Sequence, residues 1–189
     1  MAIANSLDHV LYRLAHKSDA PEILALQKVA YQSEAEIYGD ESVPALQQTL
    51  EELHADFEGT SAFTAPNSGA SLVESKAADR VVFIKAVVNG KIIGSVGGFA
   101  KGDSAYVNRV VVHPYFQGRG IGRRLVAEIE KAFAEARRFE VFTGSQSERN
   151  LRQFRRLGYS EFKTESFSPA ITWVYMQKER SCPLSPLSN

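Results

Sequence analysis

The sequence has very little cysteine: Cys182 is the single one among 189 residues. One thiol cannot close a disulfide within the chain, which excludes a disulfide-stapled scaffold and favours a reducing compartment. No apolar run reaches the roughly 20 residues that a membrane-spanning helix needs. Residues 1–8 carry neither a basic nor an apolar stretch, so we expect no secretory signal, no membrane association and a cytoplasmic protein.

Net charge is absent as well. Lys and Arg number 22, as do Asp and Glu, so the formal charge is zero. Proteins that bind nucleic acids generally carry a basic excess, and we therefore expect no nucleic-acid partner. A hydrophobic content of 44% is typical of a soluble globular protein. The length predicts one domain over residues 1–180. Residues 59–79 are rich in Ser, Ala and Gly without periodicity, which predicts a flexible loop, and the prolines and serines of 181–189 predict a disordered tail.

The zero balance hides a segregation of charge along the chain. Residues 18–60 hold ten acids against one base, Lys28, whereas residues 109–138 hold seven bases against three acids. One interpretation is two solvated helix faces of opposite sign. The other is a site for a cationic ligand on the first segment and for an anionic ligand on the second. Charge counts alone leave both open.

Hydrophobic periodicity predicts alternating strands and helices. Asp19 and Glu22 have capping-box spacing around Pro21, which predicts a helix start. The Asn89-Gly90 pair predicts a tight hairpin. We expect strands at 10–14, 80–88, 91–99, 105–112, 139–143, 161–167 and 171–177, and helices at 19–38, 44–57, 120–138 and 147–157. This order predicts an α/β (α+β) fold with a mixed, mostly antiparallel sheet flanked by helices.

A Gly-rich loop between a strand and a helix is the most informative motif. The strand ends at His113-Pro114, where His113 is interpreted as a turn residue, and Gln117–Gly122 leads directly into the helix. Free backbone amides at a helix N-terminus, with glycines that allow close approach, form an anion site. The spacing G-x-G-x-G departs from the dinucleotide fingerprint, and no Walker lysine follows. The loop fits the pattern Gln/Arg-x-x-Gly-x-Gly/Ala instead.

This loop, its flanking strand and helix, and the later Leu157-Gly158-Tyr159 together resemble the GNAT superfamily of acyl-CoA-dependent N-acyltransferases. The resemblance covers about residues 10–178 and is strongest over 105–159. It implies a GNAT-like fold whose strands splay after Val112, so that the Val110 amide bonds the thioester carbonyl oxygen. It implies a coenzyme A site formed by Val110, Val111, Val112, Gln117, Gly118, Arg119, Gly120, Ile121, Gly122, Arg123, Asn150 and Phe154.

The sequence departs from this family at both usual acid–base positions. Phe154 stands where many members have a tyrosine that protonates the leaving thiolate, and residues 105–109 lack the usual glutamate. The candidate acids are therefore Tyr159 and Tyr175, of which we take Tyr159 first. The candidate bases are Glu34, Tyr31, Tyr38 and bulk water acting through a relay, of which we take Glu34 first. Tyr31, Glu34 and Tyr38 share one helix face, and we expect them to line an acceptor pocket, although core packing is the simpler role for the two tyrosines.

These observations predict an N-acetyltransferase with acetyl-CoA as co-substrate and no metal. The expected acceptor is the primary amine of a small cationic molecule, which attacks the thioester directly. One alternative is a coenzyme A sensor or scaffold with weak or no turnover. Another is a protein N-terminal or lysine acetyltransferase, because one fold hosts all these functions. A homodimer is compatible with the sequence.

Overall fold

The computed structural model describes residues 9–40, 43–60 and 80–180. Its centre is one seven-stranded sheet with the order β1-β2-β3-β4-β5-β7-β6. The strands β4 and β5 are parallel, and the other neighbours pair in antiparallel fashion, which confirms the expected mixed sheet. The strands are β1 (Leu11–Leu14), β2 (Arg80–Val88), β3 (Lys91–Lys101), β4 (Ser104–Val112), β5 (Arg138–Gly144), β6 (Ser160–Ser166) and β7 (Thr172–Glu179).

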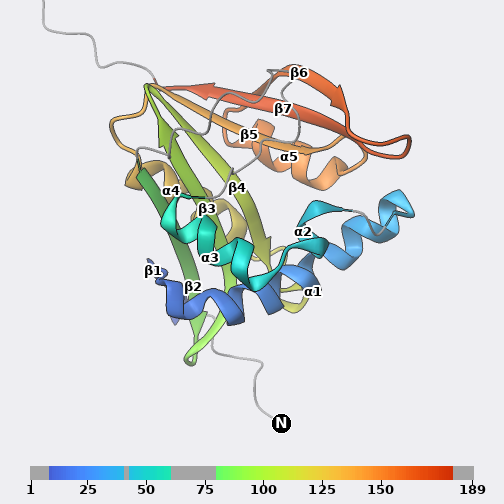
Figure 1. Ribbon diagram of the computed structural model, residues 1–189. Coiled ribbons are helices and arrows are strands. Elements are labelled where there is room, and N and C mark those ends of the chain that lie inside the picture. The colour runs from blue at the N-terminus through green and yellow to red at the C-terminus, as the bar shows by residue number, and fades with distance from the viewer. Residues whose placement is uncertain (1–8, 41–42, 61–79, 181–189) are drawn as a thin grey trace, which may run out of the picture.

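Helices cover both faces of this sheet (Figure 1). On one face α1 and α3 pack against β2, β3 and β4, and on the other α4 packs against the same strands. None of the helices in the described ranges is long and apolar enough to cross a membrane. The helices are α1 (Ala20–Tyr38), α2 (Pro44–Gln47), α3 (Leu50–Glu58), α4 (Ile121–Ala132) and α5 (Glu148–Arg156), with short 3-10 turns at Lys17–Asp19 and Pro114–Phe116.

The predicted hairpin between β2 and β3 is confirmed. Asn89 and Gly90 both have positive φ, at +49° and +76°, as a tight turn of this kind requires. The glycines of β3 allow the close approach that their density predicts. A Cβ on Gly97 would lie 2.6 Å from the Phe83 ring.

Two predicted helix boundaries are wrong, whereas the helix expected at 19–38 has its predicted bounds to within one residue but lacks the predicted capping box. The helix expected over 44–57 is two helices, because the chain is extended at Gln48 and Thr49 begins α3 with its own capping box. The α4 helix ends at Ala132 rather than at residue 138, because Phe133 leaves helical geometry and is fully buried in the core. Asp19 forms no side-chain cap on α1. Its carboxylate instead accepts hydrogen bonds from the His16 amide and from Lys85.

Two further predictions concern the loop at 59–79 and the tail at 181–189, which lie largely or wholly outside the described residues. Gly59 ends α3 with a φ of +68°. The rest of the predicted 59–79 loop, from residue 61 on, and the predicted tail at 181–189 lie outside the described residues.

Candidate active site

The strands β4 and β5 separate towards their C-terminal ends. They pair from Ser104↔Arg138 to Val107↔Val141, after which β4 continues beside β3 and β5 continues beside β7. Figure 1 shows the two strands diverging. The two strands therefore separate after Val107 and not, as expected, after Val112. A cavity of about 990 Å³ opens between the two strand ends.

A bulge in β4 shapes the wall of this cavity. The register with β3 shifts between Ser95↔Val111 and Gly97↔Asn108, and Arg109 has a φ of +51°. A residue with a side chain adopts this left-handed conformation only at a cost of order 1–3 kcal/mol, so its surroundings must hold it there. Val110 follows Arg109 directly, and both line the cavity.

A buried polar network holds Arg109. Its guanidinium donates to the carboxylate of Asp56, which is 3% exposed. The same carboxylate accepts from the Gln48 amide at 2.6 Å, and Gln48 in turn accepts from the Gln27 amide at 2.8 Å. Gln27 also donates to the Ala45 carbonyl. The network thus joins α1, α2 and α3 to the bulge of β4.

The Gly-rich loop borders the other side of the cavity. Gly118 and Gly120 have φ values of +77° and +80°, and Gly120 is the N-cap of α4. The Gln117 side chain fixes the loop, since it donates to the Val112 carbonyl at 3.0 Å and accepts from Arg149. The first amides of α4 have no partner within the helix, so this loop offers donors to an anion.

Positive charge gathers around this loop. Arg123 comes from the first turn of α4, whereas Arg149, Arg152 and Arg156 come from α5, and all four line the cavity. Guanidinium groups are the usual partners of phosphate oxygens. This half of the cavity is therefore suited to a ligand that carries several phosphate charges.

Most of the predicted coenzyme residues lie together along this half of the cavity. The lining contains Val110, Val111, Val112, Gln117, Gly118, Gly120, Ile121, Gly122, Arg123 and Asn150. Arg119 is not in the lining, and its guanidinium lies over the rings of Tyr115 and Phe116 at 5.2 and 5.7 Å. Phe154 is not in it either. Phe154 is 4% exposed and packs in the core against the Tyr159 ring, because it lies on the apolar side of α5 with Leu151.

The position of Tyr159 does not support its assignment as the acid. Tyr159 is buried outside the cavity lining, and its hydroxyl donates to Glu130 at 2.8 Å. Glu130 also pairs with Lys178 at 2.7 Å. Burial and the neighbouring Glu130 carboxylate raise the pKa of Tyr159. The residue holds α4 and the sheet together rather than facing the cavity.

The three α1 residues expected at an acceptor pocket do line the cavity. Glu34 accepts from the Ser147 hydroxyl and from the Asn150 amide, the latter at 3.1 Å. The Tyr38 hydroxyl accepts from the Gln146 amide at 2.8 Å. Its space exists because residue 144 is glycine, since a Cβ there would lie 2.0 Å from that hydroxyl. These bonds attach α1 to the start of α5.

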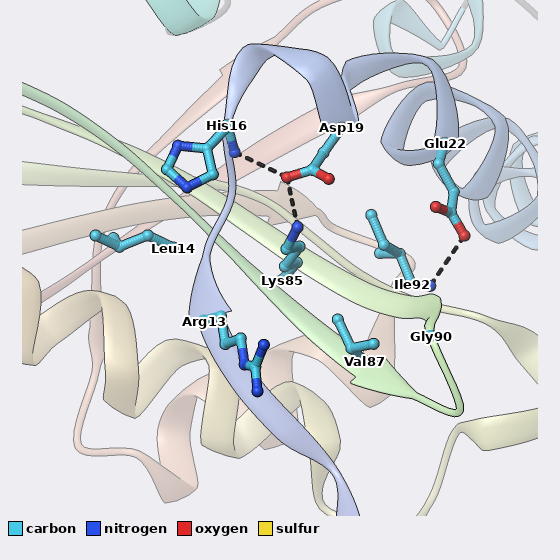
Figure 2. A pocket seen from close by; sticks show the side chains of 9 residues that line it. All are labelled: Arg13, Leu14, His16, Asp19, Glu22, Lys85, Val87, Gly90 and Ile92. Carbon is cyan, nitrogen blue, oxygen red and sulfur yellow. Dashed lines mark hydrogen bonds and ion pairs between the residues drawn. The ribbon is translucent and has the colours of Figure 1, made fainter.

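Several acids of the N-terminal segment form contacts that stabilise the fold. Figure 2 shows Asp19 beside Lys85, at 2.6 Å, and Glu22 accepting from the Ile92 amide at 3.0 Å. They line a second, shallower cavity of about 560 Å³ near the start of α1. Asp56 pairs with Arg109 as described above. Among the acids of residues 18–60 that the structure describes, Glu34 is the one that lines the larger cavity. Of these described acids, Glu34 alone remains a candidate for binding a cationic ligand in the larger cavity.

Several cavity residues are missed by sequence reasoning. Phe142, Phe167 and Trp173 line the cavity beyond Tyr38, and the Trp173 indole nitrogen is buried without a partner among the described residues. They come from the end of β5, the β6–β7 connection and the start of β7. Alternating apolar residues predict the strands but cannot indicate which side chains meet at the separated ends.

The partly buried Tyr31 predicts a loss of stability in alkali. Burial raises the pKa of Tyr31 to about 12, an increase favoured by Glu34 and opposed by Arg109. Tyrosines of the unfolded chain titrate near ~10. Between these values the folded chain retains a proton that the unfolded chain has lost, so the stabilisation present below pH ~10 disappears as pH rises to ~12. Thermal unfolding should show this fall, and Tyr31→Phe should reduce it by ~2 kcal/mol. Exposed Tyr115→Phe is the control, and an equal effect of both variants would refute the assignment.

The amino-acid sequence is similar to those of known acetyltransferases. Residues 43–180 match the family described as Acetyltransferase (GNAT) domain. The UPF0157 protein YqkA of Bacillus subtilis is 28% identical over 153 residues, which cover 80% of this chain and 38% of that protein. The chain thus spans about two fifths of the length of the curated relatives it matches.

Solved structures share the fold. The PaiA N-acetyltransferase of Thermoplasma acidophilum, in complex with coenzyme A, has a TM-score of 0.67 at 14% identity, covering 91% of this chain and 99% of that one. The ribosomal-protein-S18-alanine N-acetyltransferase of Escherichia coli has a TM-score of 0.70 at 12% identity, covering 96% and 100%. The family match spans well over half of the sequence, and the chain belongs to the GNAT acetyltransferase family.

Proposed function

We propose that the protein transfers the acetyl group of acetyl-CoA to the primary amine of a small molecule that is cationic in water. The observation that carries this proposal is one continuous cavity with two chemically different halves. The first half combines the Gly-rich loop with four arginines, and the second contains Glu34. The diverging C-terminal ends of β4 and β5 lie between these two halves of the cavity. An anionic cofactor and a protonated amine would therefore meet where β4 is bulged.

The coenzyme half offers each chemical part of coenzyme A a partner. The amides from Gly118 to Gly122 and the side chain of Arg123 would bind the pyrophosphate, as at other helix N-termini. The exposed edge of Val110–Val112 would pair with the amide groups of the pantetheine arm. The Val110 amide would donate to the thioester carbonyl oxygen. Such a bond strengthens as negative charge develops on that oxygen during attack.

The transfer itself needs only direct attack. The neutral amine nitrogen forms a bond to the thioester carbon, the C–S bond breaks, and coenzyme A leaves as its thiolate. Holding both reactants in one cavity supplies a large share of the rate gain. Glu34 would bind the ammonium group and receive one proton before attack. The second proton that the nitrogen loses as the amide forms would pass to the thiolate, which leaves as the free thiol of coenzyme A. Tyr31, whose pKa is raised to about 12, stays a neutral phenol and can donate a hydrogen bond but cannot act as base.

Two observations support the alternative of a coenzyme A sensor. Phe154 has no hydroxyl to protonate a thiolate, and residues 105–109 of β4 contain no carboxylate. The fold shared with a ribosomal-protein N-acetyltransferase supports protein N-terminal acetylation as a third candidate. A thiol-release assay with acetyl-CoA separates the three. Release with a small amine supports our proposal, release with an alanine-starting peptide supports the third, and binding without release supports the sensor.

Glu34 should control the amine substrate rather than the coenzyme. We expect Glu34→Gln to raise the KM for the accepted amine by about tenfold, because one carboxylate–ammonium interaction is lost. The KM for acetyl-CoA should change little. Steady-state kinetics with each substrate varied in turn measures both values. Glu36→Gln, an exposed carboxylate on the same helix and outside the lining, is the matched control. Equal changes in both KM values for Glu34→Gln would contradict this role.

A further inference from the structure

The half of the cavity beyond Glu34 has a mainly apolar lining. Five aromatic rings and several aliphatic side chains surround it, drawn from α1, the start of α2, the end of β5, the β6–β7 connection and the start of β7. They are Tyr31, Ile37, Tyr38, Val43, Pro44, Ala45, Phe142, Phe167 and Trp173. Pockets lined this way bind the apolar bodies of ligands and use a few polar groups for orientation.

Carboxylates are scarce in the cavity. Glu34 is one, and both of its oxygens already accept hydrogen bonds from the start of α5. Among the described lining residues, the other carboxylate is that of Glu148, which lies 4.0 Å from Arg152 on α5. A polyamine or an aminoglycoside carries several ammonium groups, and each needs an acidic partner when it leaves water. The described lining suits one ammonium group.

Three aromatic side chains form a continuous wall in this half. The Trp173 ring lies 5.4 Å from Phe142, edge to face, and 5.6 Å from Phe167. The Trp173 indole nitrogen is buried and has no hydrogen-bond partner among the described residues. Aromatic faces attract both flat apolar groups and cations.

We infer that the acceptor is a monoamine whose amino group is attached to an apolar body of about the size of one aromatic ring. This inference rests on the proposed acetyl transfer and narrows its substrate class. The ammonium group would pair with Glu34, and the ring would pack on the wall of Phe142, Phe167 and Trp173. The amine would then lie on the Glu34 side of the separated strands, towards the coenzyme half.

Trp173 provides a direct test, because it is the single tryptophan of the chain. The protein saturated with coenzyme A is titrated with 2-phenylethylamine or with spermidine while its tryptophan fluorescence is recorded. We expect a saturable change with 2-phenylethylamine and at least tenfold weaker binding of spermidine. The same order should hold for kcat/KM in the thiol-release assay. Equal or tighter binding of spermidine would overturn the inference.

Two phenylalanines of the β6–β7 hairpin supply the matched variants. Phe167→Ala removes part of the wall and should weaken 2-phenylethylamine binding by about tenfold. Phe162→Ala removes an exposed ring on β6 outside the lining and should leave binding unchanged. Equal affinities of the two variants would overturn the wall as the binding surface. Saturable binding without thiol release would instead overturn acetyl transfer while upholding the ligand class, so the two failures are distinguishable.

Discussion

Replacing Gly120 with glutamate is expected to lower the affinity for coenzyme A by about a hundredfold or more. The new carboxylate would stand at the N-cap of α4, where the proposal places the pyrophosphate. Two like charges about 4 Å apart near a protein surface repel by ~4 kcal/mol, and a hundredfold loss requires about 2.7 kcal/mol. A Cβ at residue 120 would have no atom within 4 Å, so a steric clash would not contribute to the loss of affinity.

Gly102→Glu is the matched control for this variant. Gly102 also has a positive φ, +58°, and open space for a Cβ, but it lies in the β3–β4 turn and outside the cavity lining. Both variants therefore share the backbone strain and the added charge. Calorimetric titration with coenzyme A compares them directly. If the folded Gly120 variant bound as tightly as the Gly102 variant, the loop would not be the pyrophosphate site.

Replacing Asp56 with alanine is expected to lower the free energy of unfolding by about 3 kcal/mol. Asp56 is 3% exposed and accepts from both Arg109 and Gln48, so its removal leaves a largely buried guanidinium and a buried amide without this acceptor. Breaking one partner of a buried ion pair costs about 3–5 kcal/mol, and the partial exposure of Arg109 favours the lower value. For a chain of this length the melting temperature should fall by roughly 6–12 °C.

Thermal unfolding of a small set of variants tests this interaction. Glu58→Ala is the control, because Glu58 also lies on α3 but pairs with Lys17 at the exposed surface. It should change stability little. Adding Arg109→Met to Asp56→Ala should recover part of the loss, since the buried charge is removed with its partner. A small effect of Asp56→Ala, similar to that of Glu58→Ala, would show that the network does not hold the bulge.

Local sequence signals predicted the parts of the fold that depend on neighbouring residues. Asn89-Gly90 determined a hairpin, and the loop at Gln117–Gly122 lies at the start of α4 as its spacing required. The break between α2 and α3 also had a local signal. Thr49 and Glu52 have capping-box spacing, and the structure shows both of the expected hydrogen bonds. The uninterrupted apolar pattern of the two helices obscured it.

The misplaced site residues depend on which side of an element faces the cavity. Motif spacing located Phe154 on α5 but not its direction, whereas Leu151, three residues earlier on the same helix face, indicated burial. The assignment of Tyr159 as the acid rests on its residue type, and its partner Glu130 lies 29 positions away in the sequence. Likewise no local pattern joins Asp56 to Arg109, which are 53 positions apart. Contacts of this range are set by the packing of the whole domain.

Direct acetyl transfer between two ligands in one cavity is the central claim, and a single-turnover experiment with isotopically labelled acetyl-CoA tests it most directly. The protein is mixed with one equivalent of labelled acetyl-CoA, with or without 2-phenylethylamine. The masses of the protein, coenzyme A, acetyl-CoA and the amide are then measured by mass spectrometry. We predict that free coenzyme A and the labelled amide appear together in equal amounts only when the amine is present, while the protein mass stays unchanged. Label retained on the protein, or intact acetyl-CoA bound to the protein after incubation with this and every other amine tested, would contradict the account.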